Sequence, residues 1–510
     1  MKNNLFIGAL ILIVLSFCVL SCTEDFLDQK PTSTLTELTY YKNVDELETG
    51  LTACYAAIIW YWTDNYLWGF GDVGSDDADK GSFDMDQADL LEVSYSRQNA
   101  ANSWVLWRWN AFYMIIARCN QVIDRSAGTQ SDDPDEIEKI VDQAKFIRAM
   151  CFYHLVTEFG DIPLANRFLY PDELILNRAP ADSVWVQIES DLIDATNLPT
   201  VSQWGESGRI TSGAAWALLG KVYLTQRKYA AANNAFSKVV GSEEYSLVPD
   251  FGYIFSHNGE NCDESIFEFQ YWNNIQGEVA DGTSPYRLPR DPGQGWGFDC
   301  PTKDLFDEFE PGDPRIIYTF MFKGDVFPMG NETYTVLNTE SPTGYNSRKA
   351  WIPYAERENW GWWELDFNYR YMRYAEVLLL YAESLNEVNK QDSARLLVNM
   401  IRERARNIPT TDEQRISCAY PLPHPEDLLP EVTTNNQSEL RQAIWHEQRV
   451  ELATEGHRRD ALLRTGRFKE CMEKAKAYAG VIVEQHEWLL PIPEQEITLS
   501  NGLLTQNPGY

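Results

Sequence analysis

The chain has 510 residues, of which 44% are hydrophobic and 13% aromatic, so it can bury a large core and is not globally disordered. Its 43 Lys and Arg residues stand against 76 Asp and Glu residues, giving a net charge of −33. Because so acidic a chain is repelled by phosphate backbones and by anionic membrane surfaces, nucleic acid is not expected as a partner.

Residues 1–21 have the form of a bacterial secretory signal, with Lys2 ahead of an apolar run. The signal ends Val19-Leu20-Ser21-Cys22, which looks like a lipobox, in which Cys22 becomes the lipidated first residue of the mature chain. We therefore expect contact with a membrane through N-terminal acyl chains only, with ordinary secretion as the alternative. No later stretch reaches 18 consecutive apolar residues, so no other membrane segment is expected.

Much of the mature chain has the 3.6-residue periodicity of helices. The predicted helices are residues 45–61, 103–125, 134–158, 181–197, 211–226, 229–241, 371–389, 391–407, 438–455 and 457–474. Residues 242–370 are instead rich in Gly, Pro, Asn and aromatic residues, with short β-like runs, which predicts a long, irregular insertion. We expect one domain, residues 22–510, whose helical scaffold spans about 40–241 and 371–510.

A tetratricopeptide-like repeat is the sharpest internal signal. The matching residues are Trp216, Leu219, Gly220, Tyr223, Ala232 and Phe236. Small residues let two antiparallel helices approach, while the aromatic residues fill the surrounding grooves. Weaker copies occur around Ala149 and Ala382, and one repeat cannot bury its own faces, so several must stack. The predicted fold class is mostly α, a tetratricopeptide-like α-solenoid with a large loop-rich insertion carrying a few short strands.

Two glycine and acidic motifs are interpreted as structural. Gly69 to Gly74 matches G-x-G-x-x-G, but the Asp residues that follow would repel a pyrophosphate, so we expect a flexible loop. These acidic residues fail the spacing of a calcium-binding loop, which favours a solvated acidic loop over a metal site. The scattered Cys and His residues predict neither a zinc site nor a disulfide framework, and no cofactor is expected.

Charges recur at helical spacing in the C-terminal helices, from Arg373 to Asp460. Such spacing brings opposite charges within reach of each other. We interpret them as an ion-pair network that locks the solenoid rather than as catalytic groups.

The 17 Trp and 26 Tyr residues exceed what helix packing requires. Trp68 belongs to an aromatic run that leads into the acidic loop, and the insertion carries Trp272, Tyr286, Trp296 and Trp360. A flat aromatic ring beside polar groups is what a sugar ring requires, because its C–H face packs on the ring while its hydroxyls form hydrogen bonds. These residues are therefore predicted to contact a glycan.

Several motifs along the mature chain together resemble one family. They are Cys22 to Asp28, Phe146-Ile147-Arg148-Ala149, Phe159 to Leu164, Asp263-Glu264-Ser265-Ile266-Phe267, Phe309 to Arg315, Glu447-x-Arg449-x-Glu451 and the terminal Gln506-Asn507-Pro508-Gly509-Tyr510. In these motifs the chain resembles the SusD/RagB family of outer-membrane lipoproteins from Bacteroidetes.

The resemblance implies a non-catalytic protein, lipid-anchored in the outer membrane and facing the cell exterior. Such proteins form a lid on a SusC-like, TonB-dependent β-barrel transporter and deliver oligosaccharide or polysaccharide to it. The ligand site lies on the loop-rich face, and its transfer to this chain points to Asp76, Asp77 and Trp104, with Trp272 and Trp296.

Three alternatives remain at this stage: the same lid role with oligopeptide cargo, a surface glycoside hydrolase, and a plain helical-repeat scaffold. A clustered aromatic platform favours glycan, whereas an extended groove with free backbone groups favours peptide.

Overall fold

A computed structural model describes residues 40–61, 63–271, 283–291, 294–329, 332–338, 341–352, 367–409 and 429–510. The predicted signal, the predicted lipidation site Cys22, and two predicted ligand contacts, Trp272 and Trp360, lie outside the described residues. Among the helices in these ranges, none combines the length and hydropathy that a bilayer crossing requires.

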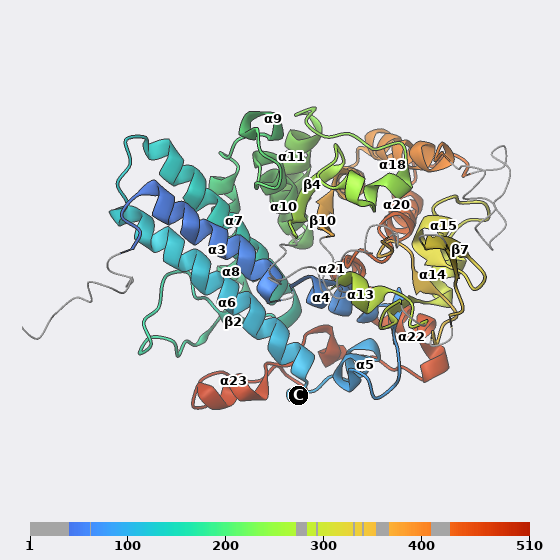
Figure 1. The fold of residues 1–510 in the computed structure, drawn as a ribbon, viewed down its shortest axis with the longest axis horizontal. Helices are drawn as coiled ribbons and strands as arrows, with labels where there is room; N and C mark the ends of the chain where they lie inside the picture. The colour runs from blue at the N-terminus through green and yellow to red at the C-terminus, as the bar shows by residue number, and fades with distance from the viewer. Residues whose placement is uncertain are drawn as a thin grey trace, which may run out of the picture.

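Two blocks of helices form the scaffold (Figure 1). The first block contains α3 (Val44–Trp60), α6 (Ser103–Arg125), α7 (Pro134–Phe159), α8 (Ala181–Ala195), α10 (Ser212–Thr225) and α11 (Tyr229–Val240). The second contains α17 (Tyr374–Glu387), α18 (Gln391–Arg406), α20 (Gln437–Glu451), α21 (Arg458–Thr465) and α22 (Phe468–Ala475). The short helix α23 (Glu494–Leu499) lies apart from this block, near the start of α6. Helix α11 packs directly on α17, so the blocks form one stack although the insertion separates them in sequence.

The predicted helices are found in the structure, with two differences. Residues 371–373, predicted as the start of a helix, belong to strand β10 (Tyr369–Arg373), and α17 begins at Tyr374. The periodic stretch 457–474 is two helices rather than one, because Gly466 adopts a left-handed conformation (φ 74°) that ends α21.

The repeat predicted from residues 216–236 packs as its residue types require. A Cβ atom on Gly220 would lie 2.5 Å from the Phe236 ring, so only glycine permits this approach of α10 and α11. Ala232 and Phe236 are fully buried, as are Ala149 on α7 and Ala382 on α17. The pairs α7–α8 and α17–α18 therefore extend the stack that the weaker sequence copies predicted.

The described parts of residues 242–370 contain only short elements, as predicted. The helices are α12 (Phe251–Ile254), α13 (Thr283–Arg287), α14 (Lys303–Glu308) and α15 (Ile316–Thr319), and the strands are β4 (Ser265–Phe269), β5 (Phe298–Pro301), β6 (Phe320–Met321), β7 (Val326–Met329), β8 (Glu332–Thr335) and β9 (Asn346–Ser347). Two antiparallel pairings attach the insertion to the scaffold: β5 pairs with β1 (Ala78–Gly81), and β4 pairs with β10 (Tyr369–Arg373).

The glycine motif is not the flexible loop expected from the sequence. Gly69–Val73 forms one buried turn of π-helix, η1, directly after α4 (Thr63–Trp68). A Cβ atom on Gly71 would lie 2.0 Å from the carbonyl oxygen of Gly456. The expectation was wrong because the motif permits close backbone packing against the C-terminal helices, a use that sequence spacing does not reveal.

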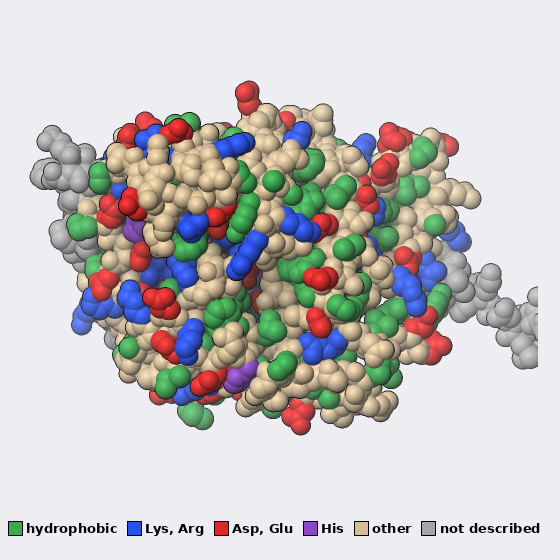
Figure 2. Space-filling model, turned by 180° about the vertical axis from the view of Figure 1, so that it is seen from behind, with side chains coloured by type: hydrophobic (Ala, Val, Ile, Leu, Met, Phe, Trp, Pro, Cys, Tyr) green, Lys and Arg blue, Asp and Glu red, His purple; other side chains and the backbone are tan. Residues whose placement is uncertain are grey.

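The predicted ion-pair network is present and buried. The Arg373 guanidinium donates to Glu264 at 2.8 Å, to Glu451 at 2.6 Å and to Glu455 at 2.7 Å. Because Glu264 belongs to the insertion, the network holds the insertion against the helices as well as the helices against each other. At the surface, Lys and Arg residues are interspersed with Asp and Glu (Figure 2).

Candidate ligand-binding surface

The predicted ligand residues Asp76 and Asp77 face the protein interior. Each side chain is about 1% exposed. Arg458 binds Asp76 through two hydrogen bonds of 2.7 Å, and Arg449 donates to Asp77 at 2.8 Å. The structure therefore uses these carboxylates to attach their loop to α20 and α21, and does not present them to a ligand.

Their pKa values follow from this burial and pairing. Burial raises the pKa of Asp76, but Arg449 and Arg458 outweigh it and hold the pKa below its usual range. Burial raises the pKa of Asp77 to about 6 against the same two arginines.

Trp68 and Trp104 are also core residues, which corrects the prediction that they contact the ligand. Both indoles are buried and meet edge to face, with ring centroids 5.9 Å apart. The Trp68 indole N–H donates to Asn65 at 3.0 Å, and that of Trp104 donates to Gln87 at 3.0 Å. A buried Trp requires such a partner for its N–H. Sequence reasoning missed this because indoles of the core and of a ligand surface are the same residue type.

Two turns distant in sequence meet at the end of the β1–β5 ribbon. In this antiparallel pair Gly81 lies opposite Phe298, so the turn after β1 and the turn before β5 are neighbours. The N–H of Ser82 donates to the carbonyl of Gly297 at 2.8 Å. Gly81 and Gly297 both have φ of +73°, which favours glycine.

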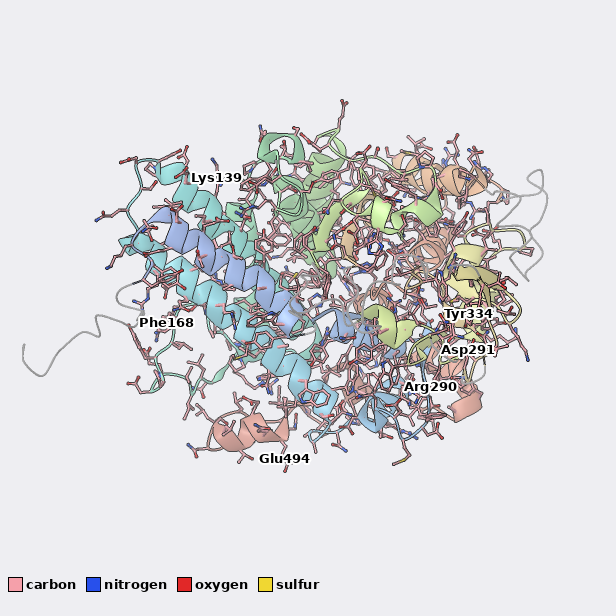
Figure 3. The ribbon with its side chains drawn as sticks, in the orientation of Figure 1. Lys139, Phe168, Arg290, Asp291, Tyr334 and Glu494 are labelled. Atoms are coloured by element: carbon pink, nitrogen blue, oxygen red, sulfur yellow. The ribbon has the colours of Figure 1, made fainter. Side chains whose placement is uncertain are left out.

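Phe83, Arg290 and Trp296 form a cluster on these turns, named here the Phe83–Trp296 platform. Phe83 is 49% exposed and Trp296 is half-buried. The Arg290 guanidinium lies over both rings, 4.0 Å from the Phe83 centroid and 5.6 Å from the Trp296 centroid. Figure 3 labels Arg290 in the half of the molecule that carries α13, α14 and α5 (Ala88–Ser94).

Neighbouring polar groups hold the platform in position. Arg290 donates to the Asp86 carboxylate at 2.7 Å and to the Ser82 hydroxyl at 2.5 Å. The buried Lys80 ammonium donates to the backbone carbonyls of Phe83 at 2.5 Å and of Asp86 at 2.7 Å, and burial lowers the pKa of Lys80. The aromatic faces are therefore fixed next to a guanidinium and a carboxylate, the combination that a polyhydroxylated ring requires.

Tyr286 and Trp296 are the predicted residues that the structure brings to this region. Tyr286 is half-buried on α13, and its ring centroid lies 6.3 Å from that of Phe298. The backbone N–H of Trp296 donates to the carbonyl of Pro285 at 3.0 Å. Sequence reasoning missed Phe83 and Arg290. The available signal was an aromatic side chain within the acidic segment 82–89, which was interpreted as a solvated loop.

In the described residues, no group of three or more His, Cys, Asp or Glu side chains is arranged to hold a metal ion.

Comparison with known proteins decides the family. Residues 263–510 match the model of the SusD family, and residues 25–224 match a SusD-like model described as starch-binding, associating with the outer membrane. The chain belongs to the SusD/RagB family. SusD family members are non-catalytic binding proteins, and the second model associates this chain with the outer membrane.

The similarity to individual SusD-like proteins extends over nearly the whole chain. SusD-like protein P2 of Formosa agariphila is 28% identical, with 98% of each chain covered. The solved structure of a laminarin-binding SusD-like protein has 27% identity and a TM-score of 0.75, covering 92% of this chain and 100% of the other. Surface glycan-binding protein A from Bacteroides fluxus has 24% identity and a TM-score of 0.76, covering 92% of this chain and 100% of the other, and shows the common fold.

Proposed function

We propose that this SusD-like protein captures oligosaccharide at the cell surface on the Phe83–Trp296 platform. The observation that carries the proposal is the juxtaposition of an exposed Phe83 ring and a half-buried Trp296 ring around one fixed guanidinium. A sugar ring can pack its C–H face on either aromatic side chain while Arg290 and Asp86 exchange hydrogen bonds with its hydroxyls. The laminarin-binding relative supports glucan oligosaccharides as the first ligands to test.

The proposal includes the tether and the delivery step. Lipid on Cys22 would hold the protein on the outer membrane, on the exterior side, without any spanning helix. Bound glycan would then pass to a SusC-like, TonB-dependent transporter, for which this protein serves as the lid. The family resemblance and the outer-membrane description of the matching model support both steps.

The capture function is tested with the lipid-free mature chain, in which Cys22→Ser removes the acylation site. Titration calorimetry against a panel that includes laminarin oligosaccharides should reveal at least one ligand. Phe83→Ala and Trp296→Ala should each weaken its binding about fivefold, since one aromatic contact contributes on the order of 1 kcal/mol.

Trp107→Ala is the matched control, because Trp107 is an exposed aromatic residue on α6 that belongs to no part of the platform. Its affinity should equal that of the unmodified protein. Unchanged affinity in both platform variants would refute the assignment of the site, and binding of oligopeptides but no glycan would refute the cargo.

A further inference from the structure

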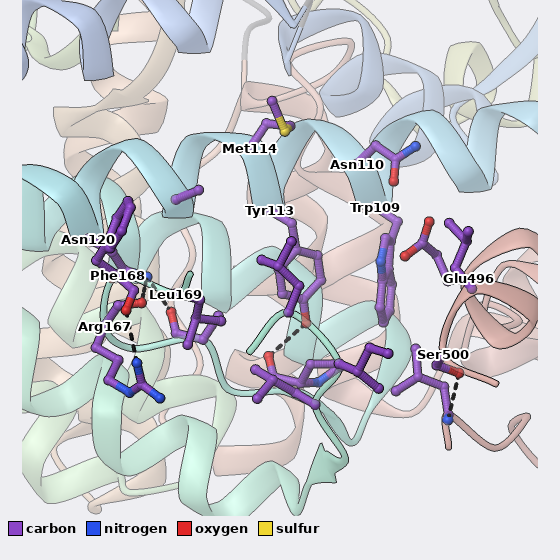
Figure 4. A pocket seen from close by; sticks show the side chains of 18 residues that line it. Trp109, Asn110, Tyr113, Met114, Asn120, Arg167, Phe168, Leu169, Glu496 and Ser500 are labelled. Atoms are coloured by element: carbon purple, nitrogen blue, oxygen red, sulfur yellow. Dashed lines mark hydrogen bonds between the residues drawn. The ribbon is translucent and has the colours of Figure 1, made fainter. Parts of the chain in front are cut away.

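A second concave surface lies far from the platform, between α6, the loop of residues 163–176 and α23. It encloses about 620 Å³. Figure 4 shows Trp109 and Tyr113 projecting from α6 into it, with Arg167 and Phe168 at one end and Glu496 at the other. Figure 3 labels Phe168 on this helical side of the molecule and Arg290 on the opposite side.

The walls of this groove are mainly aliphatic. Leu169, Leu174, Ile175, Leu176 and Leu504 line it, and Leu174 is 62% exposed. A concave surface lined by exposed apolar side chains is typical of a contact site.

Three polar side chains in the walls already have partners within the protein. The Tyr113 hydroxyl donates to the carbonyl of Pro163 at 2.8 Å, and the Asn120 amide donates to that of Ala165 at 2.6 Å. The Ser500 hydroxyl donates to the carbonyl of Ile497 at 2.8 Å. These three groups therefore offer few hydrogen bonds to the hydroxyls of a sugar, and the mainly aliphatic walls suit apolar side chains.

The described chain begins beside one end of this groove. The Thr129 hydroxyl donates to the carbonyl of Tyr41 at 2.9 Å, and residue 129 follows the end of α6. Near the same helix end, the Arg125 guanidinium lies 5.1 Å from the centroid of Phe168, which lines the groove. The chain that precedes Tyr40 is therefore joined to the body of the protein close to the Phe168 end.

The preceding segment has the length and the side chains to occupy the groove. Residues 22–39 span up to about 60 Å when extended, whereas the groove follows α6 from Trp109 to Asn120, about 16 Å. The segment carries four large apolar residues, Phe26, Leu27, Leu35 and Leu38, and Pro31 favours an extended path.

We propose that residues 25–38 of the same chain cover this groove, with Phe26 and Leu27 against its apolar wall. The docked segment shortens the tether. Only residues 22–24 would remain free between the anchor and the folded body, instead of residues 22–39. This consequence for the tether rests on the proposed lipid on Cys22, whereas the docking itself does not depend on lipid or on glycan binding.

The test uses the full mature chain with Cys22→Ser and without detergent, because detergent would itself fill an apolar groove. The photoreactive amino acid p-benzoylphenylalanine replaces Phe26, and irradiated monomer is analysed by mass spectrometry. Cross-links are expected to residues 109–120, 163–176 or 496–504. The same probe in place of Met85, which is 87% exposed beside the platform, should label none of these three segments.

A second measurement does not rely on cross-linking. Amide hydrogen exchange in residues 163–176 should become at least tenfold faster in the Phe26→Asp/Leu27→Asp variant, with an unchanged melting temperature. Thr32→Ala is the control within the same segment and should leave the exchange unchanged. Cross-links from position 26 to other parts of the molecule, cross-links only between molecules, no cross-links at all, or unaltered exchange would each overturn the proposal. Loss of glycan binding in the platform variants leaves these readouts untouched, so the two proposals fail separately.

Discussion

His446, on α20, shows how single residues set the response of this protein to pH. Its Nδ1 lies 2.7 Å from Glu308 and its Nε2 lies 3.3 Å from Glu310, both in or beside α14. Burial lowers the pKa of His446, but the hydrogen bond to Glu308 and the nearby carboxylate of Glu310 outweigh burial and raise it to about 9. The same contacts lower the pKa of Glu310 to about 2.

We predict that His446→Gln destabilises the protein in a pH-dependent manner. The folded-state pKa lies above the unfolded value of about 6.5, so the stabilising contribution is complete below pH 6.5 and is lost as pH rises to about 9. Urea denaturation should show a loss of about 3 kcal/mol at pH 6 and little loss at pH 9.5. Equal losses at both pH values would contradict the charged pairing.

Two Trp residues predicted to contact the ligand, Trp296 and Trp104, have opposite environments. Trp296 is half-buried under Arg290, whereas Trp104 donates its N–H to Gln87 from the core. An alanine variant of Trp104 would therefore report on folding rather than on a ligand contact.

At the level of elements, buried ion pairs connect the insertion to the C-terminal helices. Arg315 binds Asp313 at 2.6 Å within the insertion, and reaches Glu447 at 2.5 Å and Glu451 at 2.9 Å on α20. Glu451 also receives Arg373, which begins α17 as its N-cap residue. The short strands of the insertion contribute few ladder hydrogen bonds, so these charges provide much of its attachment.

Arg373→Met should therefore lower the free energy of unfolding by about 3–5 kcal/mol, because the buried carboxylates of Glu264, Glu451 and Glu455 each lose one of their cationic partners. Chemical denaturation measures this loss.

Arg395→Met serves as the control. Arg395 pairs with Asp392 three residues earlier on the surface of α18, where the Asp392 side chain is 81% exposed. It should cost no more than about 0.5 kcal/mol. Similar losses in the two variants would contradict a special role for the buried network.

At the level of the whole molecule, the C-terminal residues connect the first helical block to the end of the chain. The Asn507 amide donates to the carbonyl of Phe159, at the end of α7, at 3.0 Å and to that of Leu490 at 2.7 Å. Arg178 donates to the Asn507 side-chain oxygen. The terminal motif that resembles the family therefore holds the end of α7 against the C-terminal residues.

Asn507→Ala is expected to destabilise the protein by about 2–4 kcal/mol, since the Leu490 carbonyl loses its partner and the Phe159 carbonyl and the Arg178 guanidinium each lose one hydrogen bond. Differential scanning calorimetry should record a lower melting temperature. Thr505→Ala, an exposed neighbour whose backbone carbonyl alone binds Arg178, should melt like the unmodified protein. An unshifted Asn507→Ala variant would contradict this fastening role.

Helix positions and the repeat were readable from local pattern alone. Periodicity located α6 and α10 to within a residue or two, because burial of one helix face imposes that spacing on the sequence. The Gly220–Phe236 contact followed from the repeat for the same reason. Regular charge spacing likewise predicted the network around Arg373, although not that its partner Glu264 would come from the insertion.

The ligand surface depended on contacts that no local pattern encodes. The β1–β5 pairing joins residues more than 200 positions apart in the chain, and it alone brings Phe83 beside Arg290 and Trp296. The same long-range packing turned Asp76 and Asp77 inward to Arg449 and Arg458. Local composition shows that a segment is acidic or aromatic, but whether its side chains meet solvent depends on which distant element covers them, and only the tertiary structure decides that.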